Sequence, residues 1–167
     1  MKLIENCKKT QAAGIVLKKM KRMAGLDGWI WSCDVHLNNV KIGGIFDDGN
    51  GGCLNVDISA TDQSKLVAAL KAVDYPLGLT FEGEDRVEPT TDYGYIEWVL
   101  PSIADECETL KKMQRAAKTK TLYQLHDDKE DEHWVIKQVY SEGLAAALHA
   151  KHGANLKLIL NEAIAAL

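Results

Sequence analysis

Apolar and polar residues alternate most regularly between Trp29 and Ile58. From Trp29 to Leu37 every second residue is apolar, which is the period of a strand with one buried face. Asn38-Asn39 predicts a two-residue turn, because asparagine tolerates positive φ better than most residues. The expected hairpin register pairs Leu37 with Val40, His36 with Lys41, Val35 with Ile42, Cys33 with Gly44, and Trp31 with Phe46. A third strand over residues 53–58 would complete an antiparallel meander.

The rest of the chain shows helical periodicity interrupted by two further strand pairs. The expected helices cover residues 15–23, a segment capped by Ser59, Thr61 or Asp62 that ends near Pro76, a segment starting at Ser102, residues 141–152, and a last helix opened by Asn155. The expected strand pairs are residues 77–81 with 93–100, joined by an acidic turn at 82–86, and residues 121–125 with 134–140. In the second pair, Tyr123, Leu125, Trp134 and Ile136 would share a face if His126 pairs with His133.

This order of elements predicts an α+β fold with a mainly antiparallel sheet, made of the meander and two further hairpins and packed by about five helices. The chain has 167 residues, of which 46% are hydrophobic and 26% charged. These values are typical of a globular protein, so we expect a single α+β domain over residues 1–167.

The sequence also favours a cytoplasmic protein that does not enter a membrane. No apolar run approaches the roughly 18 to 20 residues that span a bilayer, and the first residues lack the apolar segment of a signal peptide. The four cysteines stand apart, without a CxxC pair, so reduced thiols are expected. The pattern places Cys33 and Cys107 in the core.

Charge is unevenly distributed although the net charge is only −4. Residues 1–25 and 111–126 are basic, whereas residues 26–110 contain sixteen acidic and four basic side chains. Two basic segments therefore form a nucleic-acid-binding hypothesis: Lys18, Lys19, Lys21, Arg22, Lys111, Lys112, Arg115 and Lys118. Basic side chains also complement the dipole at a helix C-terminus, and we favour this second interpretation.

No short motif assigns a catalytic residue, a metal site or a cofactor. The glycine-rich segment Asp47–Gly52 lies between two predicted strands and has neither the spacing of a phosphate-binding loop nor that of an EF-hand. His149 and His152 could share a helix face and bind a metal, but we favour the interpretation that they complement the dipole at a helix end. The sequence leans away from an enzyme without excluding one.

One polar constellation deserves a test as a ligand-binding site. The hairpin register places His36 opposite Lys41 and brings Asp34 to the same face, beside a glycine-rich loop. The full set of candidates is Asp34, His36, Lys41, Asp47, Asp48, Asn55 and Asp57. The competing interpretation, which we favour, is the ordinary solvent-exposed face of a one-sided antiparallel sheet.

These patterns lead to three functional hypotheses, of which we favour the first. The first is a small binding or regulatory protein whose partner is another protein or a small phosphorylated ligand, such as an accessory inhibitor of the kind that phages and mobile elements encode. The second is a small hydrolase or transferase that uses Asp34, His36 and Asp57. The third is a nucleic-acid-binding protein that uses the two basic segments.

Overall fold

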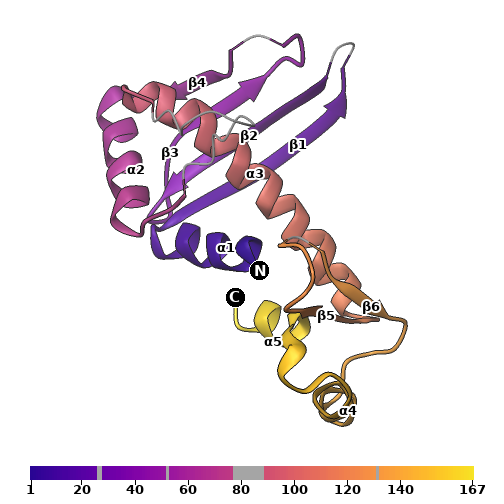
Figure 1. The fold of residues 1–167 in the computed structure, drawn as a ribbon. Coiled ribbons are helices and arrows are strands. Elements are labelled where there is room, and N and C mark those ends of the chain that lie inside the picture. The colour runs from indigo at the N-terminus through magenta and orange to yellow at the C-terminus, as the bar shows by residue number, and fades with distance from the viewer. Residues whose placement is uncertain (26–27, 52, 77–88, 131) are drawn as a thin grey trace. The chain divides into compact units, whose positions relative to one another are not determined.

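The computed structural model describes residues 1–25, 28–51, 53–76, 89–130 and 132–167. The chain divides into two compact units, each built around its own antiparallel sheet (Figure 1). Residues 9–104 form the large-sheet unit, and residues 1–8 together with 105–167 form the small-sheet unit. The expected α+β class with antiparallel sheets is confirmed. The expectation of one domain stays a prediction, because compactness alone does not decide whether two units fold together.

The described elements are five α-helices, seven strands and one 3₁₀ turn. The helices are α1 (Lys2–Ala12), α2 (Ala60–Ala72), α3 (Asp92–Ala117), α4 (Glu142–His152) and α5 (Leu160–Ala165). The strands are β1 (Ile15–Ala24), β2 (Trp29–Leu37), β3 (Val40–Asp47), β4 (Asn55–Ile58), β5 (Thr121–Leu125), β6 (Trp134–Ile136) and β7 (Leu156–Ile159). The 3₁₀ turn, Gly153–Asn155, precedes β7.

The large sheet is a four-stranded antiparallel meander in the order β1-β2-β3-β4. One of its faces is covered by α2 and by residues 92–104 of α3 (Figure 1). Buried side chains from both layers include Ile15, Leu17, Cys33, Val35, Leu37, Ile45, Ile58, Leu66, Val67, Leu70, Ile96, Val99, Leu100 and Ile103. Alternate residues of every strand therefore point away from the helices, and this second surface is called the outer face below.

A β-bulge in β3 corrects the expected hairpin register. Leu37 pairs with Val40 and His36 with Lys41 as predicted, but the register then shifts by one, so that Val35 pairs with Gly43. Beyond the bulge Cys33 pairs with Ile45 and Trp31 with Asp47, in place of the predicted Gly44 and Phe46. The extra residue moves Phe46 to the outer face, where the residue is 43% exposed.

The first predicted helix is wrong over residues 15–23, which form the edge strand β1. The helix α1 ends at Ala12, and Gly14 follows with φ of 71°. Ile15 and Leu17 are buried at alternate positions opposite Leu37 and Val35. Pairing with β2 thus overrides the helical propensity of the lysine-rich segment.

The helix α2 confirms the predicted cap, because the Ser59 hydroxyl accepts a hydrogen bond from the Asp62 backbone N–H at 3.2 Å. The predicted strand over residues 93–100 and the helix start at Ser102 are both wrong. The helix α3 begins at Asp92 and contains Pro101 in its interior. The strand expected at 77–81 and the acidic turn at 82–86 lie outside the described residues.

The small-sheet unit contains a three-stranded antiparallel sheet in the order β6-β5-β7. Its β5–β6 pairing places Tyr123 opposite Trp134, two residues away from the register that a His126–His133 pair would give. The cap of α4 by Ser141 and its end at Gly153 are as predicted. The last predicted helix is wrong at its start, because residues 156–159 pair with β5 before α5 begins.

Two apolar clusters and one buried amide hold this unit together. One cluster is Met1, Leu3, Ile4, Cys7, Met113, Leu122, Leu160 and Ile164, and the other is Tyr123, Ala145, Leu148 and Ile159. The Asn161 side chain accepts a hydrogen bond from Leu122 N at 2.7 Å and donates to Lys120 O at 2.9 Å. Its polar atoms are thereby satisfied inside the unit.

Candidate functional site

The outer face of the large sheet presents two rows of side chains that cross all four strands. Strand pairing aligns Lys18, Asp34, Gly44 and Asp57 in one row, and Lys21, Ser32, Phe46 and Asn55 in the next. Paired residues on one face have Cβ atoms about 5 Å apart, so each row is continuous. Because Gly44 has no side chain, the first row leaves a gap at its centre.

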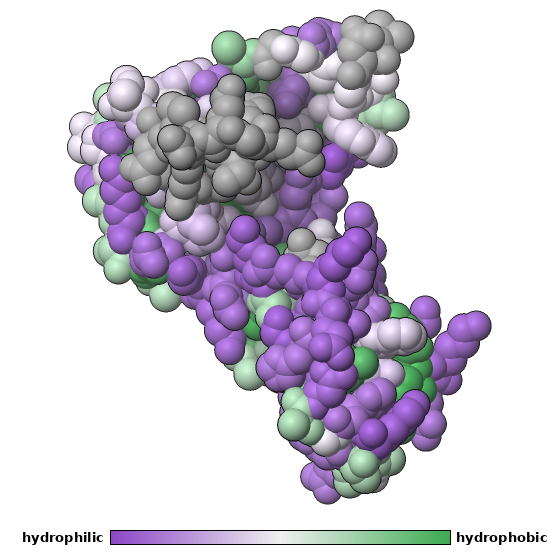
Figure 2. All heavy atoms as spheres, in the orientation of Figure 1, coloured by the Kyte–Doolittle hydropathy of each residue, from purple (hydrophilic) through white to green (hydrophobic). Residues whose placement is uncertain are grey.

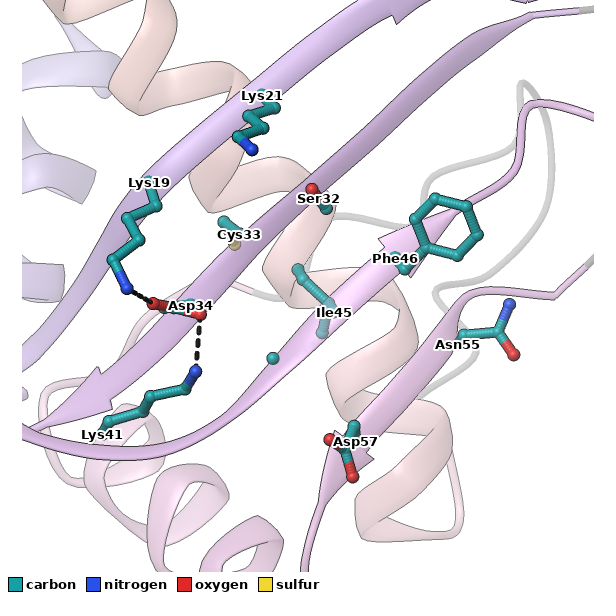
Figure 3. Close-up of a pocket in the computed structure, with 11 residues that line it drawn as sticks. Lys19, Lys21, Ser32, Cys33, Asp34, Lys41, Ile45, Phe46, Asn55 and Asp57 are labelled. Carbon is teal, nitrogen blue, oxygen red and sulfur yellow. Dashed lines mark ion pairs between the residues drawn. The ribbon is translucent and has the colours of Figure 1, made fainter.

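A groove of about 390 Å³ occupies this part of the sheet and is called the lysine groove. It is lined by Lys19, Lys21, Ser32, Cys33, Asp34, Lys41, Gly44, Ile45, Phe46, Asn55 and Asp57. Figure 3 shows its lysines on the β1 side and at the start of β3, and Asn55 and Asp57 on β4. The groove therefore separates basic groups from an amide and a carboxylate.

Asp34 holds two of the lysines together. Its carboxylate lies 3.0 Å from Lys19 Nζ and 2.7 Å from Lys41 Nζ (Figure 3). Hydrogen bonds from Lys41 and Lys19 lower the pKa of Asp34 from 3.8 to about 2, so it remains ionised at neutral pH. Such a carboxylate is a weak general base, because an efficient base has a pKa near the working pH.

A second bulge, in β1, places Lys19 and Lys21 at the groove. The β1–β2 register shifts between Lys18 and Lys21, and Lys19 adopts a positive φ of 52°. Lys21 then pairs with Ser32 on the outer face. Among the described residues Lys21 has no ion-pair partner, so its ammonium group is available to a ligand.

The structure separates the seven predicted ligand-binding residues into two groups. Asp34, Lys41, Asn55 and Asp57 line the lysine groove. The other three, His36, Asp47 and Asp48, do not. The His36 ring Nδ1 lies 3.4 Å from Asn39 O at the hairpin turn.

Asp47 and Asp48 organise the turn after β3. Asp47 accepts hydrogen bonds from Trp31 Nε1 at 3.2 Å and from Gly49 N at 2.8 Å. Asp48 accepts one from Asn50 N at 3.1 Å. Both carboxylates therefore have local structural partners, which is the usual use of aspartate in turns.

The eight basic residues predicted to bind nucleic acid are divided between the two units. Lys18, Lys19, Lys21 and Arg22 lie on β1 of the large-sheet unit, and the guanidinium of Arg22 lies 4.7 Å from the centre of the Trp29 ring. The other four, Lys111, Lys112, Arg115 and Lys118, belong to the small-sheet unit, where the first three lie on α3 and Lys118 directly follows it. The dipole explanation is wrong for the β1 group, which is not helical, but fits the last turn of α3.

Sequence reasoning missed three features of the groove. It assigned Lys19 and Lys21 to a helix, and it placed Phe46 on the buried face. The available signals were the apolar run Ile15-Val16-Leu17, whose β-branched residues favour a strand, and the Gly43-Gly44 pair, since glycine inside a strand often marks a bulge.

Exposed apolar residues also occur on the small-sheet unit, where Trp134, Val135 and Val139 are exposed on or just after β6. Figure 2, viewed from the helix side of the large sheet, shows mainly hydrophilic residues on the small-sheet unit, with hydrophobic atoms near one edge. Among the described residues no cluster of three His, Cys, Asp or Glu side chains could hold a metal ion. No described helix combines the length and apolar character that crossing a membrane requires.

Comparisons with known proteins do not assign the chain to a family. No protein-family model, curated protein or solved structure matches it. Any function must therefore be inferred from the groove itself.

Proposed function

We propose that this chain is a binding protein that holds a phosphate-bearing ligand in the lysine groove. The observation that carries the proposal is the convergence of Lys19, Lys21 and Lys41 on one hollow of about 390 Å³. This volume lies within the range of small-ligand pockets, about 300 to 1,000 Å³. Lysine ammonium groups bind phosphate oxygens as compact point charges.

The charges of the groove support an anionic ligand although the whole chain is acidic. Three lysines face two carboxylates, Asp34 and Asp57, so the lining has a net positive charge. Asp34 already neutralises part of the charge of Lys19 and Lys41, whereas Lys21 has no ion-pair partner among the described residues. We therefore expect modest binding that weakens as added salt screens these charges.

The geometry supports the other hypotheses less well. A protein partner could extend the sheet at β1, but edge strands rich in lysine and interrupted by a bulge are the usual protection against such pairing. A hydrolase would need a base, and the low pKa of Asp34 suits it to holding lysines instead. A continuous basic surface made from both segments stays a prediction, since the segments belong to different units.

Calorimetric titration with sodium tripolyphosphate at low salt tests the proposal. Lys21→Gln and Lys41→Gln should each weaken binding about tenfold, because each removes a charged hydrogen-bond donor. Lys65→Gln is the matched control, since Lys65 lies on α2 and pairs with Asp62 outside the groove. The absence of measurable binding, or an equal loss in the Lys65 variant, would refute the proposal.

A further inference from the structure

An exposed aromatic ring stands inside the lysine groove. Phe46 projects from β3 on the same side of the sheet as Asp34 and Lys19 (Figure 3). The residue is 43% exposed, and its neighbours across the sheet are Ser32 and Asn55. A phenylalanine in a polar row of the outer face gains little from folding, because burial in the core is what stabilises such a ring.

The space beside this ring suits a flat group. Gly44 is two residues before Phe46 on the same strand, so a side chain at this position would lie on the same face of the sheet. With no side chain at Gly44, the surface next to Phe46 is open, and the groove continues over it. Aromatic side chains on exposed sheets bind nucleobases by stacking, which tolerates any base because every base has a π-face.

The polar groups on either side of Phe46 match the two ends of a nucleotide. On the β1 side, Lys21 lies two strand spacings away, about 10 Å, which a lysine side chain and a ribose together can span. On the β4 side, Asn55 and Asp57 offer an amide and a carboxylate. Such groups recognise base edges, since a carboxylate accepts from the exocyclic amine of cytosine and an amide pairs with adenine.

We infer that the ligand is a nucleotide unit, with its base stacked on Phe46, its phosphate among Lys19, Lys21 and Lys41, and its base edge toward Asn55 and Asp57. This inference rests on the proposed function and names the ligand of the same groove. The unit belongs either to a free nucleotide or to an unpaired strand. A duplex does not fit, because its bases are stacked on one another and cannot reach Phe46.

The decisive experiment uses the full chain and single-stranded decamers that carry 2-aminopurine, whose fluorescence falls when the base stacks. Phe46→Leu keeps an apolar side chain but removes the ring, so decamer binding should weaken about tenfold or more and the quenching should disappear. Phe46→Trp should retain both. Trp98→Leu is the matched control, because Trp98 is an exposed aromatic residue of the same unit outside the groove.

The outcomes separate this inference from the proposed function. If Phe46→Leu weakens decamer binding but leaves tripolyphosphate binding unchanged, the nucleotide inference is supported. If tripolyphosphate binds but the Phe46→Leu variant binds and quenches the decamer like the unsubstituted chain, the inference is overturned and the proposed function stands. If neither probe binds, both fail.

Two further comparisons define the source and the base. Equal affinity for CTP and for a cytosine decamer indicates a free nucleotide, and much tighter decamer binding indicates a single strand; either result supports a nucleotide unit. The nucleotide inference is contradicted if CTP binds no more tightly than tripolyphosphate and the decamer does not bind. Asp57→Asn should reduce the preference for cytosine over uracil decamers to about one, because the carboxylate acceptor is lost.

Discussion

At the scale of single residues, Asp34 links two of the three lysines of the groove. It lies between Lys19 and Lys41, and its side chain is only 17% exposed. The carboxylate keeps two ammonium groups close together that would otherwise repel one another. It also competes with any anionic ligand for the same two groups, so its charge limits the affinity of the groove.

Asp34→Asn should therefore have opposite effects on stability and on anion binding. Since the folded pKa is lowered to about 2, ionised Asp34 stabilises the fold above the ordinary pKa of 3.8, and this contribution is lost as the pH falls through about 2. The variant should unfold at lower urea concentration than the unsubstituted chain above pH 4, with the difference vanishing toward pH 2. Its affinity for tripolyphosphate at pH 7 should increase.

Asp62→Asn controls for a general charge effect. The pKa of Asp62 is also lowered, by hydrogen bonds from Lys65 and Ser59, but Asp62 lies on α2 outside the groove. Its substitution should leave tripolyphosphate affinity unchanged. Weaker binding by the Asp34 variant would show that positioning of the lysines outweighs the removal of a competing charge.

At the scale of elements, the bulge in β3 determines which side chains reach the outer face. A Cβ added at Gly43 would lie 1.9 Å from Asp57 O, whereas one added at Gly44 would lie 3.2 Å from Cys33 O. The first contact cannot be accommodated while β3 and β4 remain paired. The second needs a displacement of only a few tenths of an ångström.

Gly43→Ala and Gly44→Ala thus form a matched pair of substitutions. Gly43→Ala should cost about 3 kcal/mol or more in unfolding free energy, because it forces the two strands apart. Gly44→Ala should fold with much smaller loss and should weaken ligand binding by filling the floor of the groove. Urea unfolding and tripolyphosphate titration measure the two effects, and equal stability of the two variants would contradict the bulge geometry.

Much of the large sheet was predictable from local pattern, because alternation and turn residues are local signals. The β2–β3 hairpin follows from Asn38-Asn39, which have φ of 50° and 66° in the structure. The helix caps at Ser59 and Ser141 follow from side-chain hydrogen bonds within three residues. In each case the residues that produce the element lie within it or directly beside it in the sequence.

The errors arose where the secondary structure of a segment depends on residues far away in the sequence. The segment Ile15–Ala24 is a strand because it pairs with β2, although its lysines and methionines suit a helix equally well. The predicted strand over residues 93–100 and the helix start at Ser102 were wrong because α3 runs through this segment and tolerates Pro101 in its interior. The groove was predictable only in part, because the positions of Lys19 and Phe46 depend on two bulges that shift the register.

At the scale of the whole molecule, two units share continuous helices. The division between the units falls after Lys8 within α1 and after Ala104 within α3. Unfolding one unit alone would interrupt the hydrogen bonds of both helices. We therefore expect the two units to unfold together, in agreement with the prediction of a single domain over residues 1–167.

The reactivity of one buried cysteine in each unit can be used to follow the unfolding of that unit separately. Cys7 lies in the apolar core of the small-sheet unit, where burial raises the pKa of its thiol to about 12, and Cys33 is buried in the large-sheet unit. Pulses of an alkylating reagent at increasing urea concentration, resolved by peptide mass spectrometry, give one unfolding midpoint for each thiol. Cys53 is exposed and should react at every urea concentration, which controls for reagent activity.

Leu160→Ala then distinguishes cooperative from independent unfolding. Leu160 is fully buried in the small-sheet unit, so its truncation should cost about 2 to 5 kcal/mol. If the chain unfolds as one domain, the midpoints for Cys7 and Cys33 fall by the same amount, although Cys33 lies in the other unit. A shift confined to Cys7 would mean that the shared helices do not couple the two units, and that the large-sheet unit with its groove folds independently.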